Sequence, residues 1–303
     1  MDRMKGISII IPAYNREQFI AEAIGSVINQ EYDGHLEIII ADDGSSDRTI
    51  EIAESFGDKV TVLKKPANCF SQGVSSTRNR GINVSTQPYI CFLDSDDFFL
   101  PGHLKKISLA LESKNNLGFA FCRILEIKEE QDSRLFKAWT RSQITIKDIL
   151  NPAVSGNNVV CTNVFIFQKY IFDTVDGFNE NYKCAEDSDM WMRISEQYKG
   201  IFADYFGAVR RKHTFNQVTT SHPKRIGNRY HLEVYEDAIK RYYRLNLRDF
   251  YRIYRLRILV LKYTLGKISL LDNIYRSFFN KNTDKKSDWH ELSYFIEYNN
   301  RFK

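Results

Sequence analysis

The chain has 303 residues, of which 43% are hydrophobic and 27% charged, and its formal net charge is +5. This ordinary composition excludes a largely disordered chain, and the length allows one large α/β domain with an appendage. The five cysteines are widely spaced and form no C-x-x-C pair, which argues against a disulfide framework or a zinc site. No signal peptide opens the chain, and no apolar stretch reaches the roughly 18 to 20 residues that cross a bilayer. We therefore expect a cytoplasmic protein with reduced thiols, either soluble or peripheral at the inner face of a membrane.

The N-terminal third of the chain alternates between strand and helix patterns. Apolar runs of strand length are followed by segments whose apolar residues recur at helical spacing. This alternation is typical of a mostly parallel sheet whose strands are joined by right-handed crossovers. We predict strands at residues 7–11, 36–41, 60–63 and 89–93, and helices at residues 16–29, 48–56 and 77–84.

The rest of the chain is less regular. From Tyr230 onward, helix formers, aromatic residues and arginines dominate, with 15 Lys and Arg against 9 Asp and Glu. We assign residues 1–225 to an α/β domain and residues 226–303 to a helical, basic and aromatic C-terminal module. We also predict helices at residues 101–113, 169–175 and from about 186, strands at 119–127 and 163–167, a basic strand at 209–213, and an exposed excursion or flexible loop at 129–141.

The apolar run at residues 89–93 leads directly into three carboxylates, those of Asp94, Asp96 and Asp97. Ligands of open parallel sheets lie beyond the carboxyl ends of the strands, so these acids fall where a ligand would bind. Clustered carboxylates repel one another unless a cation shares them, and Mg²⁺ or Mn²⁺ prefers such oxygen ligands. The alternative is an acidic turn before a helix that begins at Pro101, because acids favour helix N-termini.

Other polar segments fall on the same predicted edge of the sheet, at residues 12–15, 42–43 and 78–79. An aromatic ring can cover a base, a carboxylate can accept an N–H from the edge of that base, and an arginine can approach phosphates or brace the acids. The set is chemically sufficient to bind a nucleoside diphosphate, although residues 42–45 alone are also typical of a turn and helix cap. The chain lacks the motifs of P-loop NTPases, dinucleotide oxidoreductases, α/β-type serine hydrolases and zincins.

The order of the polar segments carries further information. Taken together, residues 9–15, 42–47, 78–81, 92–97, and 177–178 with 186–191 resemble the successive motifs of family-two glycosyltransferases of the GT-A fold. The similarity covers about residues 5–221. It implies a Rossmann-like, mostly parallel sheet flanked by helices, with residues 1–225 as the nucleotide-sugar-binding catalytic domain. It also implies an inverting transfer of a sugar from a nucleotide sugar, with Mg²⁺ or Mn²⁺ as cofactor.

The resemblance also implies which residues bind the nucleotide. By matching position, Asp42 and Asp43 contact the nucleobase and the nearby ribose, while Pro12 and Tyr14 shape that pocket. Asp94 and Asp96 fill the two acidic positions of the family's D-x-D motif. The first of them, Asp94, and Arg78 complete the set. The predicted nucleotide-binding residues are Pro12, Tyr14, Asp42, Asp43, Arg78 and Asp94.

The metal and the catalytic base are assigned by the same matching. Asp96 is the predicted metal ligand, and Asp97 is a second candidate because adjacent acids leave the register open. Asp187 matches the catalytic base, and direct displacement with inversion needs only one such base to take the acceptor's proton. The alternative for Asp187 is a charge that stabilises a helix N-terminus. The predicted supporting residues are Glu186, Asp189, Trp191, which is either a core residue or a stacking platform, and His213, which is either a surface residue or a metal or phosphate ligand.

The expected partners are a nucleotide sugar donor and a saccharide or glycolipid acceptor, in surface-polysaccharide biosynthesis. The basic C-terminal module is either a solvated helical surface or a face that rests on an anionic membrane. No recognised nucleic-acid motif accompanies its charge, so we expect no nucleic-acid partner. Two other functions remain open, namely a metal-dependent sugar-phosphate nucleotidyltransferase and a non-catalytic nucleotide-binding module that docks at membranes.

Overall fold

The computed structural model describes residues 4–67, 73–130, 133–138, 161–212, 230, 233–238, 240 and 241, with the backbone alone at residues 128–130 and 133–138. Most of the proposed C-terminal module, and His213, lie outside these residues. Within them, no helix combines the length and the apolar character needed to cross a membrane.

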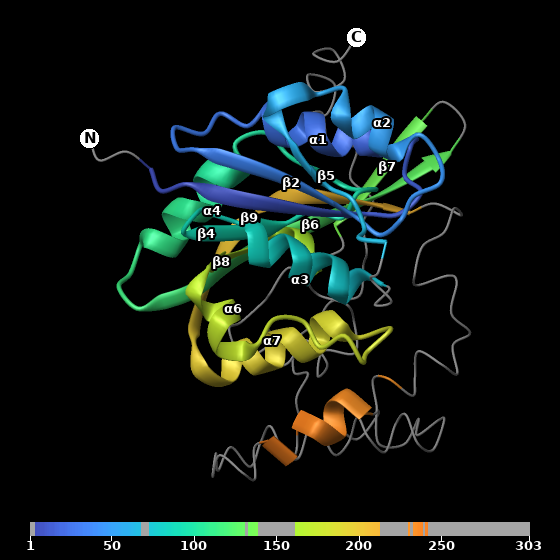
Figure 1. Ribbon diagram of the computed structural model, residues 1–303. Helices are drawn as coiled ribbons and strands as arrows, with labels where there is room; N and C mark the ends of the chain where they lie inside the picture. Colours follow the sequence, from blue (N-terminus) through green and yellow to red (C-terminus); the bar gives the residue numbers. More distant parts are fainter. Residues whose placement is uncertain are drawn as a thin grey trace.

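One nine-stranded sheet organises the described residues (Figure 1). Its strand order is β3-β2-β1-β4-β8-β6-β9-β5, and β7 pairs with β6 outside that path. In one half, β1 (Ile7–Ala13), β2 (Leu36–Asp42), β3 (Thr61–Leu63) and β4 (Tyr89–Phe92) run parallel. β1 and β4 are buried along their whole length, as expected for parallel strands whose two faces are covered by helices. The α/β fold class and the parallel strands predicted from the sequence are therefore confirmed.

The other half of the sheet is mixed. β8 (Phe165–Gln168) runs antiparallel to both β4 and β6 (Leu117–Glu130). β9 (Lys199–Lys212) pairs parallel with β6 along most of its length. The short β5 (Phe98–Phe99) and β7 (Ser133–Ala138) add antiparallel partners to β9 and β6, respectively.

The structure refines two predictions in this mixed half. The sequence predicts an exposed excursion or flexible loop at residues 129–141, whereas in the structure β6 continues to Glu130 and β7 pairs back onto it as far as Ala138, so this segment is a paired hairpin and not an irregular loop. The basic strand predicted at residues 209–213 is confirmed as far as Lys212, and it is the end of β9, which already begins at Lys199. β7 is stabilised by hairpin pairing with β6, and the end of β9 by pairing with β6 and β5, neither of which a local pattern of apolar residues reveals.

The helices cover both faces of the parallel half. Figure 1 shows α1 and α2 on one side of β1 and β2, and α3 on the other side, with α6 and α7 beyond it. α3 contacts β1 and β2, and α4 contacts β6 and β9. The helices are α1 (Ile20–Ile28), α2 (Thr49–Glu54), α3 (Val74–Val84), α4 (His103–Glu112), α6 (Tyr170–Val175) and α7 (Glu186–Gln197), with short 3-10 turns at Gly57–Lys59 and Thr162–Val164.

An aromatic cluster fixes α7 against the sheet. The Trp191 ring stacks on Phe165 and Phe167 of β8, with centroid distances of 4.2 and 5.3 Å. Phe178 packs edge-on against Phe92 of β4 at 5.3 Å. Trp191 is 3% exposed, so the structure supports its interpretation as a core residue. The Trp191 contacts hold α7 against β8.

The parallel register brings the strand ends together. Ala13 of β1 is paired with Asp42 of β2, and Leu93 continues the β1–β4 pairing by donating its N–H to the carbonyl of Ile10 at 3.1 Å. The polar residues that follow β1, β2 and β4 therefore emerge at one edge of the sheet, where ligands of such folds bind.

A glycine of α3 tests how this helix packs on the sheet. A Cβ atom at Gly81 would lie 2.4 Å from Cγ2 of Ile10, whereas a Cβ atom at Gly25 of α1 would meet nothing within 4 Å. We expect Gly81→Ala to lower the free energy of unfolding by about 1 to 3 kcal/mol. Gly25→Ala is the matched control, and we expect it to raise that free energy by up to about 1 kcal/mol. Equal effects of the two substitutions in urea denaturation would contradict the packing of α3 on β1.

Candidate active site

The loops that follow β1 and β2 are bound to each other. The Asn15 N–H donates to Oγ of Ser45 at 2.9 Å, and Oδ1 of Asn15 accepts from the Ser46 N–H at 2.8 Å. Asn15 has a φ angle of 51°, a conformation that asparagine tolerates better than most residues. Next to it, Tyr14 is 51% exposed, while Pro12 is buried. The structure thus presents the Tyr14 ring at the surface and uses Pro12 to support the loop.

Asp42 and Asp43 have different surroundings. Asp42 is 1% exposed, and its carboxylate accepts the N–H of Gly44 at 2.8 Å, which fixes the turn after β2. The Asp43 carboxylate accepts the N–H of Gly73 at 2.8 Å and lies 3.3 Å from Nζ of Lys65. Asp42 therefore shapes the turn, and the side chain of Asp43 is the one that is partly exposed.

Arg78 of α3 connects two acidic segments. Its Nη2 donates to Oδ1 of Asp94 at 2.8 Å, and its Nη1 donates to Oε1 of Glu186 at 3.1 Å. The guanidinium carbon lies 5.2 Å from the ring centroid of Phe178, and the side chain is 4% exposed. A buried guanidinium is costly unless it is paired and hydrogen-bonded, so these two carboxylates stabilise its position. The residues that follow β4 and the residues that open α7 are thereby held against one cation.

Asp97 is the buried member of the acidic turn, by which we mean residues 94–97. Its N–H donates to the Asp94 carbonyl at 3.0 Å and closes the turn. Its carboxylate accepts the Arg211 N–H at 2.7 Å and Nδ2 of Asn163 at 2.5 Å. Burial, followed by repulsion from Asp96 and Asp94, raises the pKa of Asp97 well above its usual range. Both carboxylate oxygens of Asp97 are thus engaged within the protein, which argues against its prediction as a metal ligand.

Asp94 and Asp96 are the acids of this turn that remain partly exposed. The Asp94 side chain is 32% exposed, and that of Asp96 is 14% exposed with Nε of Arg16 at 3.6 Å. The described residues contain no cluster of three or more His, Cys, Asp or Glu side chains that could hold a metal ion. Mg²⁺, however, usually binds through one or two carboxylates while substrate phosphates and water supply its other ligands. The pair formed by Asp94 and Asp96 fits such a shared site.

The first turn of α7 presents two more acids. Ala185, which precedes the helix, has a φ angle of 65°, and Glu186 and Asp187 follow it at the positive end of the helix dipole. Asp187 is partly exposed, and its Oδ1 accepts the N–H of Ser188 at 2.6 Å. Burial and repulsion by Asp187 raise the pKa of Glu186 to about 7, although Arg78 opposes this shift. Glu186 is therefore the acid paired with Arg78, and Asp187 is its partly exposed neighbour.

Asp189 lies elsewhere, on the buried side of α7. It is 1% exposed and interacts with Nε of Arg193 at 2.8 Å and with Nη1 of Arg241 at 3.5 Å. The first ion pair lies within α7, and the second joins α7 to the C-terminal segment, by which we mean the described residues 230, 233–238, 240 and 241. The structure thus separates Asp189 from the acids that surround Arg78.

The sequence profile of glycosyl transferase family 2 matches residues 8–175, more than half of the chain. The chain belongs to this family. An uncharacterised glycosyltransferase of Haemophilus influenzae is 30% identical over 233 residues, which cover 73% of this chain and 69% of that protein. The family match favours a glycosyltransferase over the nucleotidyltransferase alternative.

Two curated relatives of this family 2 glycosyltransferase have specific names. WfgD of Escherichia coli, a UDP-Glc:α-D-GlcNAc-diphosphoundecaprenol β-1,3-glucosyltransferase, is 28% identical, with coverage of 72% of this chain and 80% of WfgD. A GalNAc(5)-diNAcBac-PP-undecaprenol β-1,3-glucosyltransferase of Campylobacter jejuni is 30% identical, with coverage of 64% and 61%.

Solved structures confirm the GT-A fold expected from the sequence. S. aureus TarS, residues 1–349, in complex with UDP-GlcNAc, superposes with a TM-score of 0.60 at 18% identity and covers 77% of this chain and 66% of that one. The mannosyltransferase PcManGT from Pyrobaculum calidifontis, in complex with GDP-Man and Mn²⁺, superposes with a TM-score of 0.54 at 14% identity, with coverage of 90% and 79%.

The family 2 motifs do not reveal all the residues that build this site. Arg16 lies beside Asp96, Asn163 contacts the acidic turn, and Arg211 contacts it from β9. Asn163 shows no distinctive pattern in the sequence, and Arg211 is part of a basic run that is typical of a surface. Their contribution becomes visible only when distant strands are brought together.

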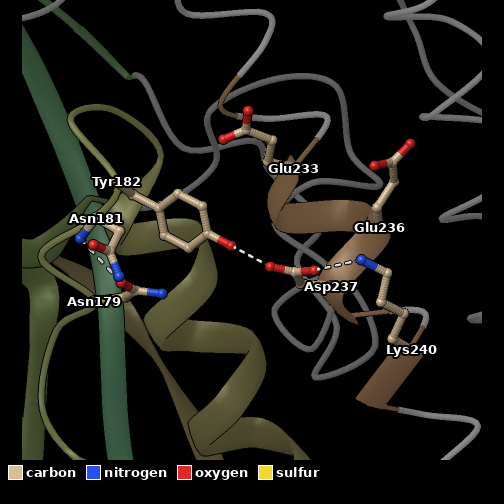
Figure 2. Close-up of a pocket in the computed structure, with 7 residues that line it drawn as sticks. All are labelled: Asn179, Asn181, Tyr182, Glu233, Glu236, Asp237 and Lys240. Carbon is tan, nitrogen blue, oxygen red and sulfur yellow. Dashed lines mark hydrogen bonds and ion pairs between the residues drawn. The ribbon is translucent and has the colours of Figure 1, made fainter.

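A groove of about 300 Å³ lies between the segment that leads into α7 and the C-terminal segment (Figure 2). The hydroxyl of Tyr182 donates to Asp237 at 2.7 Å, and Nζ of Lys240 lies 3.0 Å from the same carboxylate. Its acidic lining is unsuited to the phosphates of a nucleotide. The groove is lined by Asn179, Asn181, Tyr182, Glu233, Glu236, Asp237 and Lys240.

The raised pKa of Glu186 predicts a pH-dependent contribution to stability. Between the ordinary value of 4.5 and about 7, the unfolded chain loses this proton while the folded protein keeps it. The contribution is therefore complete below about pH 4.5 and is lost as the pH rises through 7. Relative to wild type, we expect Glu186→Gln to become more stable by on the order of 2 to 3 kcal/mol between pH 4.5 and 8. A stability difference that does not change with pH in urea titrations would contradict this protonation state.

Proposed function

We propose that this family 2 glycosyltransferase moves a sugar from a nucleoside-diphosphate sugar to a hydroxyl group of a saccharide or glycolipid acceptor, with inversion. The observation that carries the proposal is the ionic bridge of Arg78 to Asp94 and to Glu186. It holds the acids that follow β4 close to the segment that contains Asp187. A donor diphosphate at one end and an acceptor hydroxyl at the other would then share one cleft.

On the donor side, the corner formed by the loops after β1 and β2 offers a surface for the nucleoside. Tyr14 supplies an exposed ring, and Asp43 supplies a carboxylate on a turn that Asp42 holds in place. Lys65 and Arg16 place positive charge beside Asp43 and Asp96, respectively. These groups support a nucleotide that carries negative phosphates, as do the nucleotide sugars named for the TarS and PcManGT complexes.

Asp94 and Asp96 are the residues that we propose to hold Mg²⁺ or Mn²⁺ together with the donor phosphates. Such a cation stabilises the negative charge that develops on the leaving diphosphate. Arg78 and Arg16 keep the two carboxylates in position through their ion pairs.

Asp187 is the proposed general base. It stands at the start of a helix fixed by the aromatic cluster, and its carboxylate is partly exposed beside Glu186. A carboxylate in this position can take the proton of the acceptor hydroxyl as that oxygen attacks the anomeric carbon from the face opposite the diphosphate. Glu186, which is bound to Arg78, holds the first turn of α7 in place and takes no part in the proposed proton transfer.

The names of the relatives from Escherichia coli and Campylobacter jejuni support a lipid-linked saccharide as the acceptor class. We therefore propose a role in surface-polysaccharide or glycolipid assembly at the inner face of a membrane. The membrane contact through residues 226–303 stays a prediction from the sequence, for which salt-sensitive adhesion to anionic liposomes is the measurement.

Asp187→Asn separates catalysis from donor binding. We expect transfer to fall by about 10² to 10⁴-fold because the base is lost. Release of free nucleoside diphosphate from a panel of UDP-, GDP- and dTDP-sugars with Mn²⁺ measures the reaction, and calorimetry measures donor binding, which we expect to stay within a few-fold of wild type. Asp173→Asn on the exposed side of α6 is the matched control and should retain activity. Unchanged transfer by Asp187→Asn would remove Asp187 from this role.

A further inference from the structure

Arg211 of β9 is fully buried, although it belongs to a basic run. It is 1% exposed, and the neighbouring Lys212 is exposed. Its guanidinium carbon lies 4.9 Å from the ring centroid of Phe19 and 5.5 Å from that of Phe98. Removing an arginine from water in this way is unfavourable unless specific partners compensate for the lost hydration.

The partners of Arg211 lie on both sides of it. Its Nη2 donates to Oε2 of Glu22 on α1 at 2.5 Å, and its Nη1 donates to the main-chain carbonyl of Asp96 at 3.1 Å. Its own N–H donates to Oδ1 of Asp97 at 2.7 Å. One residue thus contacts the acidic turn through two hydrogen bonds and anchors that turn to α1.

Asn163 holds the other side of the acidic turn. Its Oδ1 accepts the Asp94 N–H at 2.8 Å, and its Nδ2 donates to Oδ2 of Asp97 at 2.5 Å. With Asn163 and Arg211 on opposite oxygens of Asp97, the backbone of the turn has little freedom. The side chains of Asp94 and Asp96 are the partly exposed acids of the turn.

We propose that Arg211 is a positioning residue that sets the direction of the Asp96 carboxylate by binding the carbonyl of the same residue. This inference rests on the proposed function, in which Asp96 holds the divalent cation with the donor phosphates. In this role Arg211 acts through the backbone of Asp96, whose carbonyl it binds, and not as a ligand of the cation. Its positive charge also offsets part of the repulsion among the acids of the turn.

The geometry requires an arginine. A planar guanidinium can bind Glu22 and the Asp96 carbonyl from two different nitrogens while its faces contact aromatic rings. A lysine carries the same charge but presents one nitrogen, so it cannot maintain both contacts in the same directions. Arg211→Lys therefore keeps the buried positive charge but loses the pair of contacts that orients the acidic turn.

The test of this role is the affinity of the protein for Mn²⁺, which is measured independently of its activity. The free Mn²⁺ signal in electron paramagnetic resonance is recorded while Mn²⁺ is titrated into the full chain with UDP or GDP, whichever the wild type binds. We expect Arg211→Lys to weaken Mn²⁺ binding by about 10 to 100-fold, as is typical when a residue that supports a metal ligand is changed. Lys212→Gln, on the same strand but exposed, is the control and should bind as wild type does.

Each outcome decides the question. Folded Arg211→Lys protein that binds Mn²⁺ with wild-type affinity would overturn the proposal, even if its thermal stability falls, because the role would then be structural. If Arg211→Lys does not fold, Glu22→Gln takes its place, and we expect a several-fold weaker Mn²⁺ affinity, whereas an unchanged affinity would again overturn the proposal. A failure of the proposed function is a different result, since the wild-type protein itself would then bind no Mn²⁺ with nucleotide.

Discussion

The whole site depends on one buried cation, the guanidinium of Arg78. It lies on α3, contacts Phe178, and is paired with Asp94 after β4 and with Glu186 at the start of α7. Without these carboxylates its burial would cost several kcal/mol, and without the arginine the acids would repel one another. The same ion pairs therefore stabilise the fold and hold the acidic turn after β4 next to the start of α7, the two segments that carry the proposed metal ligands and the proposed base.

Much of the fold could be predicted because the parallel half of the sheet follows local rules. Buried strands such as β1 and β4 read as continuous apolar runs, and the helices between them have clear apolar periodicity. The mixed half is different. β7 forms a hairpin with the end of β6 from a polar segment with few periodic apolar residues, and the two-residue β5 pairs with β9 across a long stretch of chain, so no apolar pattern marks either strand. These segments are strands because they pair with other strands of the folded sheet.

For the candidate site, the sequence shows which types of residue are present but not which role each residue has. The sequence indicates which segments carry acids, but it cannot distinguish Asp42 from Asp43, or Asp96 from Asp97, because adjacent carboxylates look alike. The structure distinguishes them by their partners: Asp42 caps a turn, Asp97 accepts hydrogen bonds from Asn163 and Arg211, and Asp189 pairs with Arg193 and Arg241. Each of these carboxylates is buried for a structural reason, which leaves Asp43, Asp94, Asp96 and Asp187 as the partly exposed aspartates of the predicted set, with Glu186 as its partly exposed glutamate.

A double-mutant cycle on the free energy of unfolding tests the shared role of Arg78 most directly, with Asp94→Asn and Glu186→Gln made singly and together at about pH 8, above the raised pKa of Glu186. Because both carboxylates bind Arg78, the loss of one must change the effect of losing the other. We expect a coupling free energy of about 0.5 to 3 kcal/mol. Effects that add to within about 0.3 kcal/mol would show that the two acids are independent, and would contradict a site organised by one shared arginine.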